Sequence, residues 1–127
     1  MSASPAYAAT PANACITIST ANTNRDGSGV ISDLITGAVN GSRVDDINIA
    51  ATGTTTAGML RMYLNDTVNN NLIKEIPVTA NTPSTSNPVW QTALTDLGIV
   101  LKPGWKLRFS TNNAESFSIT VTRAGDF

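Results

Sequence analysis

Apolar and polar residues alternate along much of this chain, and the alternation predicts a series of short β-strands. Residues 14–19 place Ile16 and Ile18 on one side of an extended segment and Cys15, Thr17 and Ser19 on the other. A period of two residues indicates a strand with one buried face, because successive side chains of a strand point in opposite directions. Similar patterns predict extended segments at residues 30–35, 44–49, 59–64, 72–78, 89–95, 97–101, 105–110 and 116–122.

Turn-forming residues separate these segments. Asp26-Gly27, within residues 22–29, is a pair typical of tight hairpins, and Asn40-Gly41 marks the next reversal. Lys102-Pro103-Gly104 fits a type II turn, which favours proline and then glycine at its two central positions. Pro77 has no N–H to donate, so we expect its strand to lie at an edge or to contain a bulge, and we expect a further bulge near Asp45-Asp46.

The last two segments have the most regular pattern, and we expect them to form a hairpin around a loop at residues 112–115. One face of the pair is apolar and consists of Trp105, Leu107, Phe109, Phe117, Ile119 and Val121. The opposite face is rich in serine and threonine, with one lysine and one arginine. We interpret this polar face either as solvated or as a flat surface for lateral packing between subunits.

The spacing of eight or nine short strands predicts an all-β fold, either an antiparallel β-sandwich of the jelly-roll type or a barrel, and we favour the sandwich. Residues 1–13, rich in alanine, serine and proline, lack the alternation. They are predicted to form a flexible N-terminal arm that becomes ordered on a neighbouring subunit. Residues 14–127 are then a single domain, which suits a chain of 127 residues.

The composition excludes some classes of binding partner. Only 13% of the residues are charged and the net charge is −1, so we expect no binding to nucleic acid or to a membrane surface. Eighteen Thr, 13 Asn and 11 Ser make up a third of the chain, as in an all-β domain with many turns. The first residues lack the pattern of a signal peptide and no apolar run is long enough to span a membrane, so we expect a soluble protein that is not secreted.

The residues that carry most chemistry are scarce. There is no histidine, and Cys15 is the only cysteine, so we expect it to be a small buried residue without a role as a nucleophile. We predict no enzymatic activity, no catalytic residues and no cofactor. Asp45 and Asp46 are adjacent, and neighbouring residues of a strand point to opposite faces, which prevents them from acting as an acid–base pair.

Two weak patterns leave alternatives open. Residues 22–27 together with Asp33 imitate the oxygen spacing of a calcium loop, but Asn22 stands first and a short Asp stands last, so we predict a structural turn and no metal site. The aromatic side chains of Tyr7, Tyr63, Trp90 and Trp105 could form a platform for sugar stacking. We favour roles in the core or at a subunit interface, because Trp105 shares its face with apolar residues.

Several runs of sequence resemble a family of small phage and prophage virion structural proteins. They are ANTNRDGSG (21–29), ATGTTTAGMLRMYLND (51–66), EIPVTANTPS (75–84), LKPGWKLRFSTNNAESF (101–117) and GDF (125–127). The resemblance extends over nearly everything after residue 14 and includes similarity to jelly-roll proteins that decorate or cement capsids. It carries no catalytic residues.

The resemblance implies a decoration protein that binds the outer surface of the assembled head, with the major capsid protein as its partner and a homotrimer as its own assembly. Such a protein is made in the host cytoplasm and resides in the virion. A tail, neck or fibre component, or a module that binds a receptor or glycan, stays open, because fold alone does not fix function.

Overall fold

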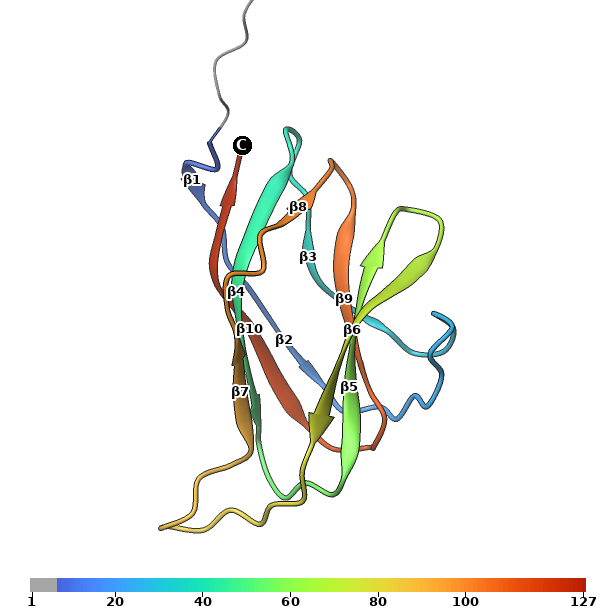
Figure 1. Ribbon diagram of the computed structural model, residues 1–127, viewed down its shortest axis with the longest axis vertical. Helices are drawn as coiled ribbons and strands as arrows, with labels where there is room; N and C mark the ends of the chain where they lie inside the picture. The colour runs from blue at the N-terminus through green and yellow to red at the C-terminus, as the bar shows by residue number, and fades with distance from the viewer. Residues whose placement is uncertain (1–6) are drawn as a thin grey trace, which may run out of the picture.

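The computed structural model describes residues 7–127, and these residues form ten β-strands and no helix. The strands make two antiparallel sheets that pack face to face (Figure 1). The predicted all-β sandwich is therefore confirmed, and the barrel alternative is wrong because the two sheets are separate and open.

The first sheet, sheet A, has two long strands at its centre. β10 (Phe117–Asp126) pairs antiparallel with β4 (Ser42–Ala51). Two short strands, β1 (Thr10–Pro11) and β2 (Ala14–Ile18), follow one another along the other side of β10. In the same way β7 (Gln91–Leu94) and β8 (Ile99–Leu101) follow one another along β4. Sheet A is therefore four strands wide, and each of its two edges consists of two successive short strands.

The second sheet, sheet B, has the order β3 (Ser32–Thr36), β9 (Lys106–Thr111), β5 (Gly58–Asn65) and β6 (Asn70–Val78). β5 and β6 form a hairpin, and β6 is an edge strand, as predicted from Pro77. The Lys102-Pro103-Gly104 turn also forms as predicted: the N–H of Trp105 donates to the carbonyl of Lys102 at 3.0 Å, and Gly104 has a φ of 82°.

The core lies between the two sheets and is made by the inward-facing side of each strand. Its fully buried side chains come mainly from the central strands, and they include Val44, Ile47, Ile49, Leu60, Leu107, Phe109, Ile119 and Val121. Burying one such side chain stabilises a fold by about 1.5–3 kcal/mol. The alternating pattern of the sequence identified this set correctly.

Two register shifts interrupt the pairing of β4 with β10, one on each side of Arg123. Arg123 lies opposite Asp46, but the next pair is Ala124 with Val44, so that Asp45 has no partner residue in the ladder. The bulge predicted near Asp45-Asp46 is therefore confirmed. Such an extra residue bends one strand locally without disrupting the rest of the sheet.

The hairpin predicted at the end of the chain is wrong. β9 lies in sheet B between β3 and β5, whereas β10 lies in sheet A, so the loop between them crosses from one sheet to the other. Each strand does have one apolar face. Two strands that face each other across a core carry the same alternation as two strands side by side, so the pattern could not distinguish these arrangements.

Residues 22–29 do not form a hairpin turn either. The loop that contains them, residues 19–31, crosses from β2 in sheet A to β3 in sheet B and is called the β2–β3 loop below. Gly27 and Gly29 have φ values of 88° and 85°, so this segment bends sharply, as its composition predicted. The chain reversal at Asn40-Gly41 forms as expected, with the N–H of Gly41 donating to the carbonyl of Ala38 at 2.8 Å.

Strand pairing begins before residue 14, where we expected the folded domain to start. Thr10 lies opposite Asp126 and Pro11 opposite Gly125, and the N–H of Ala12 donates to the carbonyl of Ala124 at 3.1 Å. Residues 10–13 of the expected arm thus lie along β10. Residues 1–6 of the arm lie outside the described residues.

Candidate functional site

The outer face of sheet B is covered by the β2–β3 loop. Beneath the loop lies Arg61 of β5, which is only 2% exposed. Its guanidinium donates to the carbonyl of Asn22 at 3.1 Å and to the side chain of Asn112 at 3.3 Å, and it pairs with Glu75 of β6 at 3.2 Å. Arg25, on the loop, pairs with the same carboxylate oxygen at 2.8 Å. One carboxylate therefore joins a cation of the sheet to a cation of the loop.

Three further side chains of sheet B hold the loop by its backbone carbonyls. The hydroxyl of Tyr63 donates to Asn24 at 3.0 Å, the amide of Asn70 to Gly27 at 3.0 Å, and the guanidinium of Arg108 to Ile31 at 2.7 Å. These contacts are spread along the loop, so the whole segment is fixed to the sheet.

The residues proposed for a calcium loop are engaged in other contacts. The amide of Asn22 donates to the carbonyls of Ser28 and Val30, at 2.9 and 3.0 Å. Asp33 pairs with Arg108 at 2.6 Å and with Lys106 at 3.2 Å. Within residues 7–127, no group of three or more His, Cys, Asp or Glu side chains is placed to hold a metal ion. The prediction of a structural turn is consistent with this arrangement.

The carboxylates that hold this cover are stabilised in their charged form. The hydrogen bond from Arg25, together with the charges of Arg25 and Arg61, lowers the pKa of Glu75. Partial burial raises the pKa of Asp33, but the hydrogen bond from Lys106 and the charge of Arg108 outweigh it, and the net pKa is lowered. Ionised Glu75 holds the loop directly through Arg25, and ionised Asp33 acts through Arg108, which donates to the carbonyl of Ile31.

Sequence reasoning missed this network. A signal was present, because Arg61 stands in the run MLRMYL, where the residues on both sides are apolar or aromatic. A charged residue at the centre of such a strand has to be buried with partners or covered. The partners lie 14 and 39 residues away in the chain, so the sequence did not identify them.

The outer face of sheet A is different, because one part of it carries no charged side chain and is not covered by any segment among residues 7–127. The cross-strand register places eight residues in two rows across β2, β10, β4 and β7. The rows are Cys15, Thr120, Asn48 and Ala93, and Thr17, Ser118, Ala50 and Gln91. All are exposed or half-buried, and none is larger than glutamine. The rows measure about 15 Å across, given a strand spacing of about 4.8 Å.

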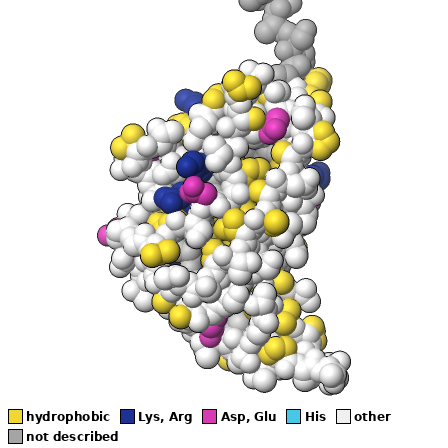
Figure 2. All heavy atoms as spheres, turned by 180° about the vertical axis from the view of Figure 1, so that it is seen from behind, with side chains coloured by type: hydrophobic (Ala, Val, Ile, Leu, Met, Phe, Trp, Pro, Cys, Tyr) yellow, Lys and Arg dark blue, Asp and Glu magenta, His cyan; other side chains and the backbone are white. Residues whose placement is uncertain are grey.

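Charged side chains of sheet A gather beyond these rows and pair with one another. Arg123 contacts Asp46 at 3.2 Å and Asp96 at 3.0 Å, and Arg43 contacts Asp45 at 2.9 Å. The backbone N–H of Asp96 and the Arg123 guanidinium lower the pKa of Asp46. The two adjacent aspartates thus serve separate ion pairs. On the side of the molecule drawn in Figure 2, most of the surface carries no charged side chain.

Cys15 is exposed, which contradicts the prediction that it is buried. It alternates with Ile16 and Ile18, whose side chains point toward the core, so its own side chain lies on the outer face of sheet A. The prediction relied on the usual preference of free cysteine for the interior, and the strand register overrode that preference.

The four candidate aromatic residues have unlike surroundings. Tyr63 is fully buried under the β2–β3 loop, so the alternative of a sugar-stacking role is wrong for this residue. Trp90 packs edge-on against Phe117 with ring centroids 5.9 Å apart, and both tryptophans are half-buried against the core. Tyr7 is 75% exposed. The tryptophans thus have the core contacts that we favoured.

Comparisons with known proteins add no family: no protein-family model matches the chain, and no curated protein is significantly similar to it. Within residues 7–127 there is no helix that is long and apolar enough to cross a membrane.

Proposed function

We propose that this chain is a phage virion structural protein that decorates or cements the assembled capsid. The proposal rests on the sequence resemblance to small phage and prophage virion proteins and on the surface of sheet A. The partner is the major capsid protein, and the site of action is the outer surface of the head, after synthesis in the host cytoplasm. The mechanism is adhesion, with no bond made or broken.

We infer further that the sandwich is a jelly roll. If β1 with β2, and β7 with β8, each count as one broken edge strand, the fold has eight strand positions. Apart from the β5–β6 hairpin, every connection between these positions crosses from one sheet to the other. Such repeated crossing is what two nested Greek keys produce, and it supports the proposed relation to jelly-roll virion proteins.

The observation that carries the proposal is the exposed, uncharged patch formed by the two rows on the outer face of sheet A. Its eight side chains form a flat surface on which copies of a subunit can pack without repulsion between like charges. We propose lateral packing between copies through this face, in a homotrimer. Many weak contacts repeated over a shell then hold each subunit firmly, because neighbouring contacts raise the effective concentration.

The copy number of this chain in purified virions tests the proposal directly. Quantitative mass spectrometry against the major capsid protein is expected to give a ratio near one, or another simple fraction repeated over the shell. A dozen or so copies would overturn the decoration role in favour of the tail, neck or fibre alternative. Absence from the particle would overturn both.

A second experiment tests the face itself in the purified chain. Sedimentation is expected to give three times the monomer mass of 13.3 kDa. Asn48→Lys places a charge in the middle of the exposed rows and is expected to dissociate the trimer, whereas Thr85→Lys, in an exposed loop, is the matched control. A wild-type monomer, or a trimer that Asn48→Lys leaves intact, would refute packing through this face.

A further inference from the structure

A long connection, the β6–β7 loop (residues 79–90), projects from the end of the sandwich opposite to the C-terminus (Figure 1). Connections in compact domains usually have about 4–6 residues. The β2–β3 loop is also long, but it is fixed to sheet B, whereas the β6–β7 loop extends beyond the end of β7 (Figure 1). Residues 84–88, called the tip below, are all exposed.

Hydrogen bonds within the β6–β7 loop hold it in one shape. The side-chain amide of Asn81 donates to the carbonyl of Pro88 at 2.9 Å. The amide of Asn87 donates to the carbonyl of Thr82 at 2.7 Å and to the side-chain oxygen of Asn81 at 3.0 Å. The N–H of Ser84 donates to the carbonyl of Asn87 at 2.9 Å. These bonds join the two sides of the loop, so its shape does not depend on a partner.

The base of the loop is fixed to the sandwich. The backbones of Asn81 and Thr55 exchange two hydrogen bonds, at 3.0 and 2.9 Å. The hydroxyl of Thr55, which is only 2% exposed, donates to the carbonyl of Thr79 at 2.8 Å. At the other end of the loop, Trp90 packs against the core, whereas residues 79–88 contribute no side chain to it. The tip is therefore ordered although the core does not need it.

The surface of the loop is polar and carries no charge. No charged residue lies between Glu75 and Asp96 in the sequence, and the tip reads Ser-Thr-Ser-Asn-Pro. Hydroxyl and amide groups can both donate and accept hydrogen bonds. A charged group of a partner would lose its hydration against this loop and gain no opposite charge. The loop therefore fits a protein surface that is itself polar and uncharged.

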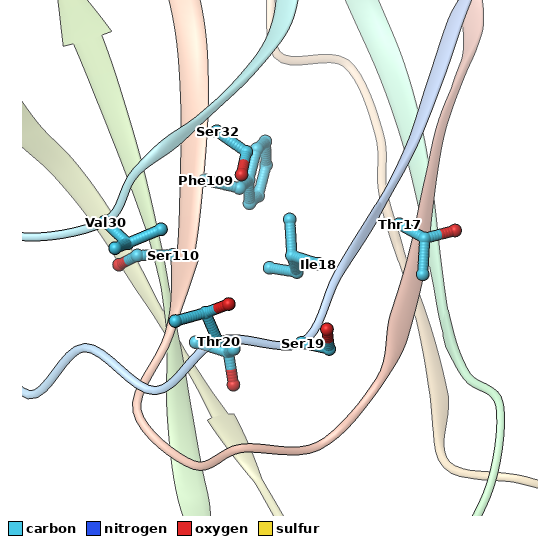
Figure 3. Close-up of a pocket in the computed structure, with 9 residues that line it drawn as sticks. Thr17, Ile18, Ser19, Thr20, Val30, Ser32, Phe109 and Ser110 are labelled. Carbon is cyan, nitrogen blue, oxygen red and sulfur yellow. The ribbon is translucent and has the colours of Figure 1, made fainter.

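The edge between β2 and β3 offers a concave surface instead. A cavity of about 100 Å³ opens there, lined in part by Ile18, Thr20 and Ser32 (Figure 3). Ligand sites usually have about 300–1,000 Å³. The buried Oγ of Ser110 has no hydrogen-bond partner among residues 7–127, but Ser110 lies opposite Arg61 in the ladder and faces the outer side of sheet B. Contact with a large partner therefore falls to convex surfaces such as the loop.

We propose that the tip of the β6–β7 loop docks on a polar, uncharged surface of the capsid shell and orients the trimer on the head. This inference rests on the function proposed above and adds the surface that contacts the shell. A loop that is already ordered loses little conformational entropy on binding. A threefold axis places three copies of the tip at one height, so all three can contact the shell together and hold it more firmly.

Co-sedimentation of the purified chain with heads from a phage that lacks it tests the proposal. Thr85→Lys places a charge on the tip and is expected to weaken binding about tenfold or more, although the trimer stays intact. Thr23→Lys, at an exposed position of the β2–β3 loop, is the matched control and is expected to bind like the wild type. Equal binding by Thr85→Lys and the wild type would overturn docking through the tip.

A second variant tests the shape of the loop without adding a charge. Asn87→Ala removes the side-chain bonds to Thr82 and Asn81. It is expected to weaken binding about fivefold, because the tip then has to be ordered on the shell. The thermal midpoint should change little, since the tip contributes nothing to the core. Undiminished binding would contradict a preordered docking loop.

The outcomes separate this inference from the function on which it rests. Failure of the wild-type chain to bind the heads would refute the decoration role and the docking surface together. Binding by the wild type that neither variant weakens would refute the docking surface alone. A change in the sedimenting mass of Thr85→Lys in the absence of heads would show that the tip contacts a second copy, and it would also overturn the proposal.

Discussion

The two sheets of this sandwich share one core, but the outer face of sheet B is covered by a loop and that of sheet A is exposed. Sheet B carries Arg61, Tyr63 and Arg108 on its central strands and is covered by the β2–β3 loop. Sheet A carries two rows of small uncharged side chains that no segment among residues 7–127 covers, with exposed ion pairs beyond them. In a sandwich the inner faces make the core, so the outer faces are where two such sheets can differ in role.

The difference follows from the energetics of burial. A large or charged side chain at the centre of a sheet can be covered only if the cover supplies hydrogen-bond partners, and the backbone carbonyls of the β2–β3 loop do this. Small side chains such as Ala50 and Thr120 need no covering segment to supply hydrogen-bond partners. Their face stays available to another molecule, which is why we place the function on sheet A and the internal stabilisation on sheet B.

Among the substitutions considered, Arg61→Ala should lower the free energy of unfolding most. It leaves the carbonyl of Asn22 without its buried donor and Glu75 without one of its two cations. We expect a loss of about 3 kcal/mol in the free energy of unfolding, measured by urea denaturation. Arg123→Ala, at an exposed ion pair of sheet A, is the matched control and should cost far less. Equal losses would mean that the contacts of Arg61 beneath the loop stabilise the fold no more than an exposed ion pair does.

Asn22→Asp sharpens the distinction between a structural loop and a cation site. The amide of Asn22 donates to two carbonyls, and a carboxylate in its place would repel both. We expect a loss of about 2 kcal/mol, measured by thermal or urea unfolding with and without calcium. Restoration of stability by millimolar calcium in this variant or in the wild type would instead favour the cation site.

Acid should loosen the cover of sheet B. The pKa of Glu75 is lowered in the folded state from an ordinary value of 4.5, so its stabilising contribution is present above that pH and is lost as the pH falls through the lowered pKa. Asp33 follows the same rule from 3.8. We expect the free energy of unfolding to fall below about pH 4.5, and to fall less steeply in Glu75→Gln. A pH profile of Glu75→Gln parallel to that of the wild type would contradict this.

Cys15→Ser should have the smallest effect. The thiol is exposed on sheet A, so we expect a change in unfolding free energy within about 0.5 kcal/mol. In the monomer that Asn48→Lys is expected to give, the thiol should react readily with a thiol reagent, and it should be protected in the wild-type trimer packed through the outer face of sheet A. Slow reaction in the monomer would mean that the residue is buried, and unchanged reactivity in the assembly would argue against packing there.

The candidate sites were less accessible to sequence reasoning than the strands were. Alternation at Ile16, Ile18 and Leu60 reports only whether a side chain faces in or out, which is a local property of an extended chain. The exposure of Cys15 follows from the same alternation, but the partners of Arg61 depend on which strands are neighbours. Those neighbours are far apart in the chain: β10 pairs with both β2 and β4, and β9 with β3 and β5.

The sequence by itself determined the all-β class, most of the strands, an edge or a bulge for the strand that contains Pro77, the bulge near Asp45-Asp46, and the apolar face of most strands. These features follow from local backbone and side-chain preferences. Only the tertiary structure decided that β9 and β10 lie in different sheets, that residues 19–31 cover sheet B, and that the outer face of sheet A is left bare. The physical reason is that a strand's pattern specifies a face to bury, whereas the choice of neighbour depends on packing the whole chain at once.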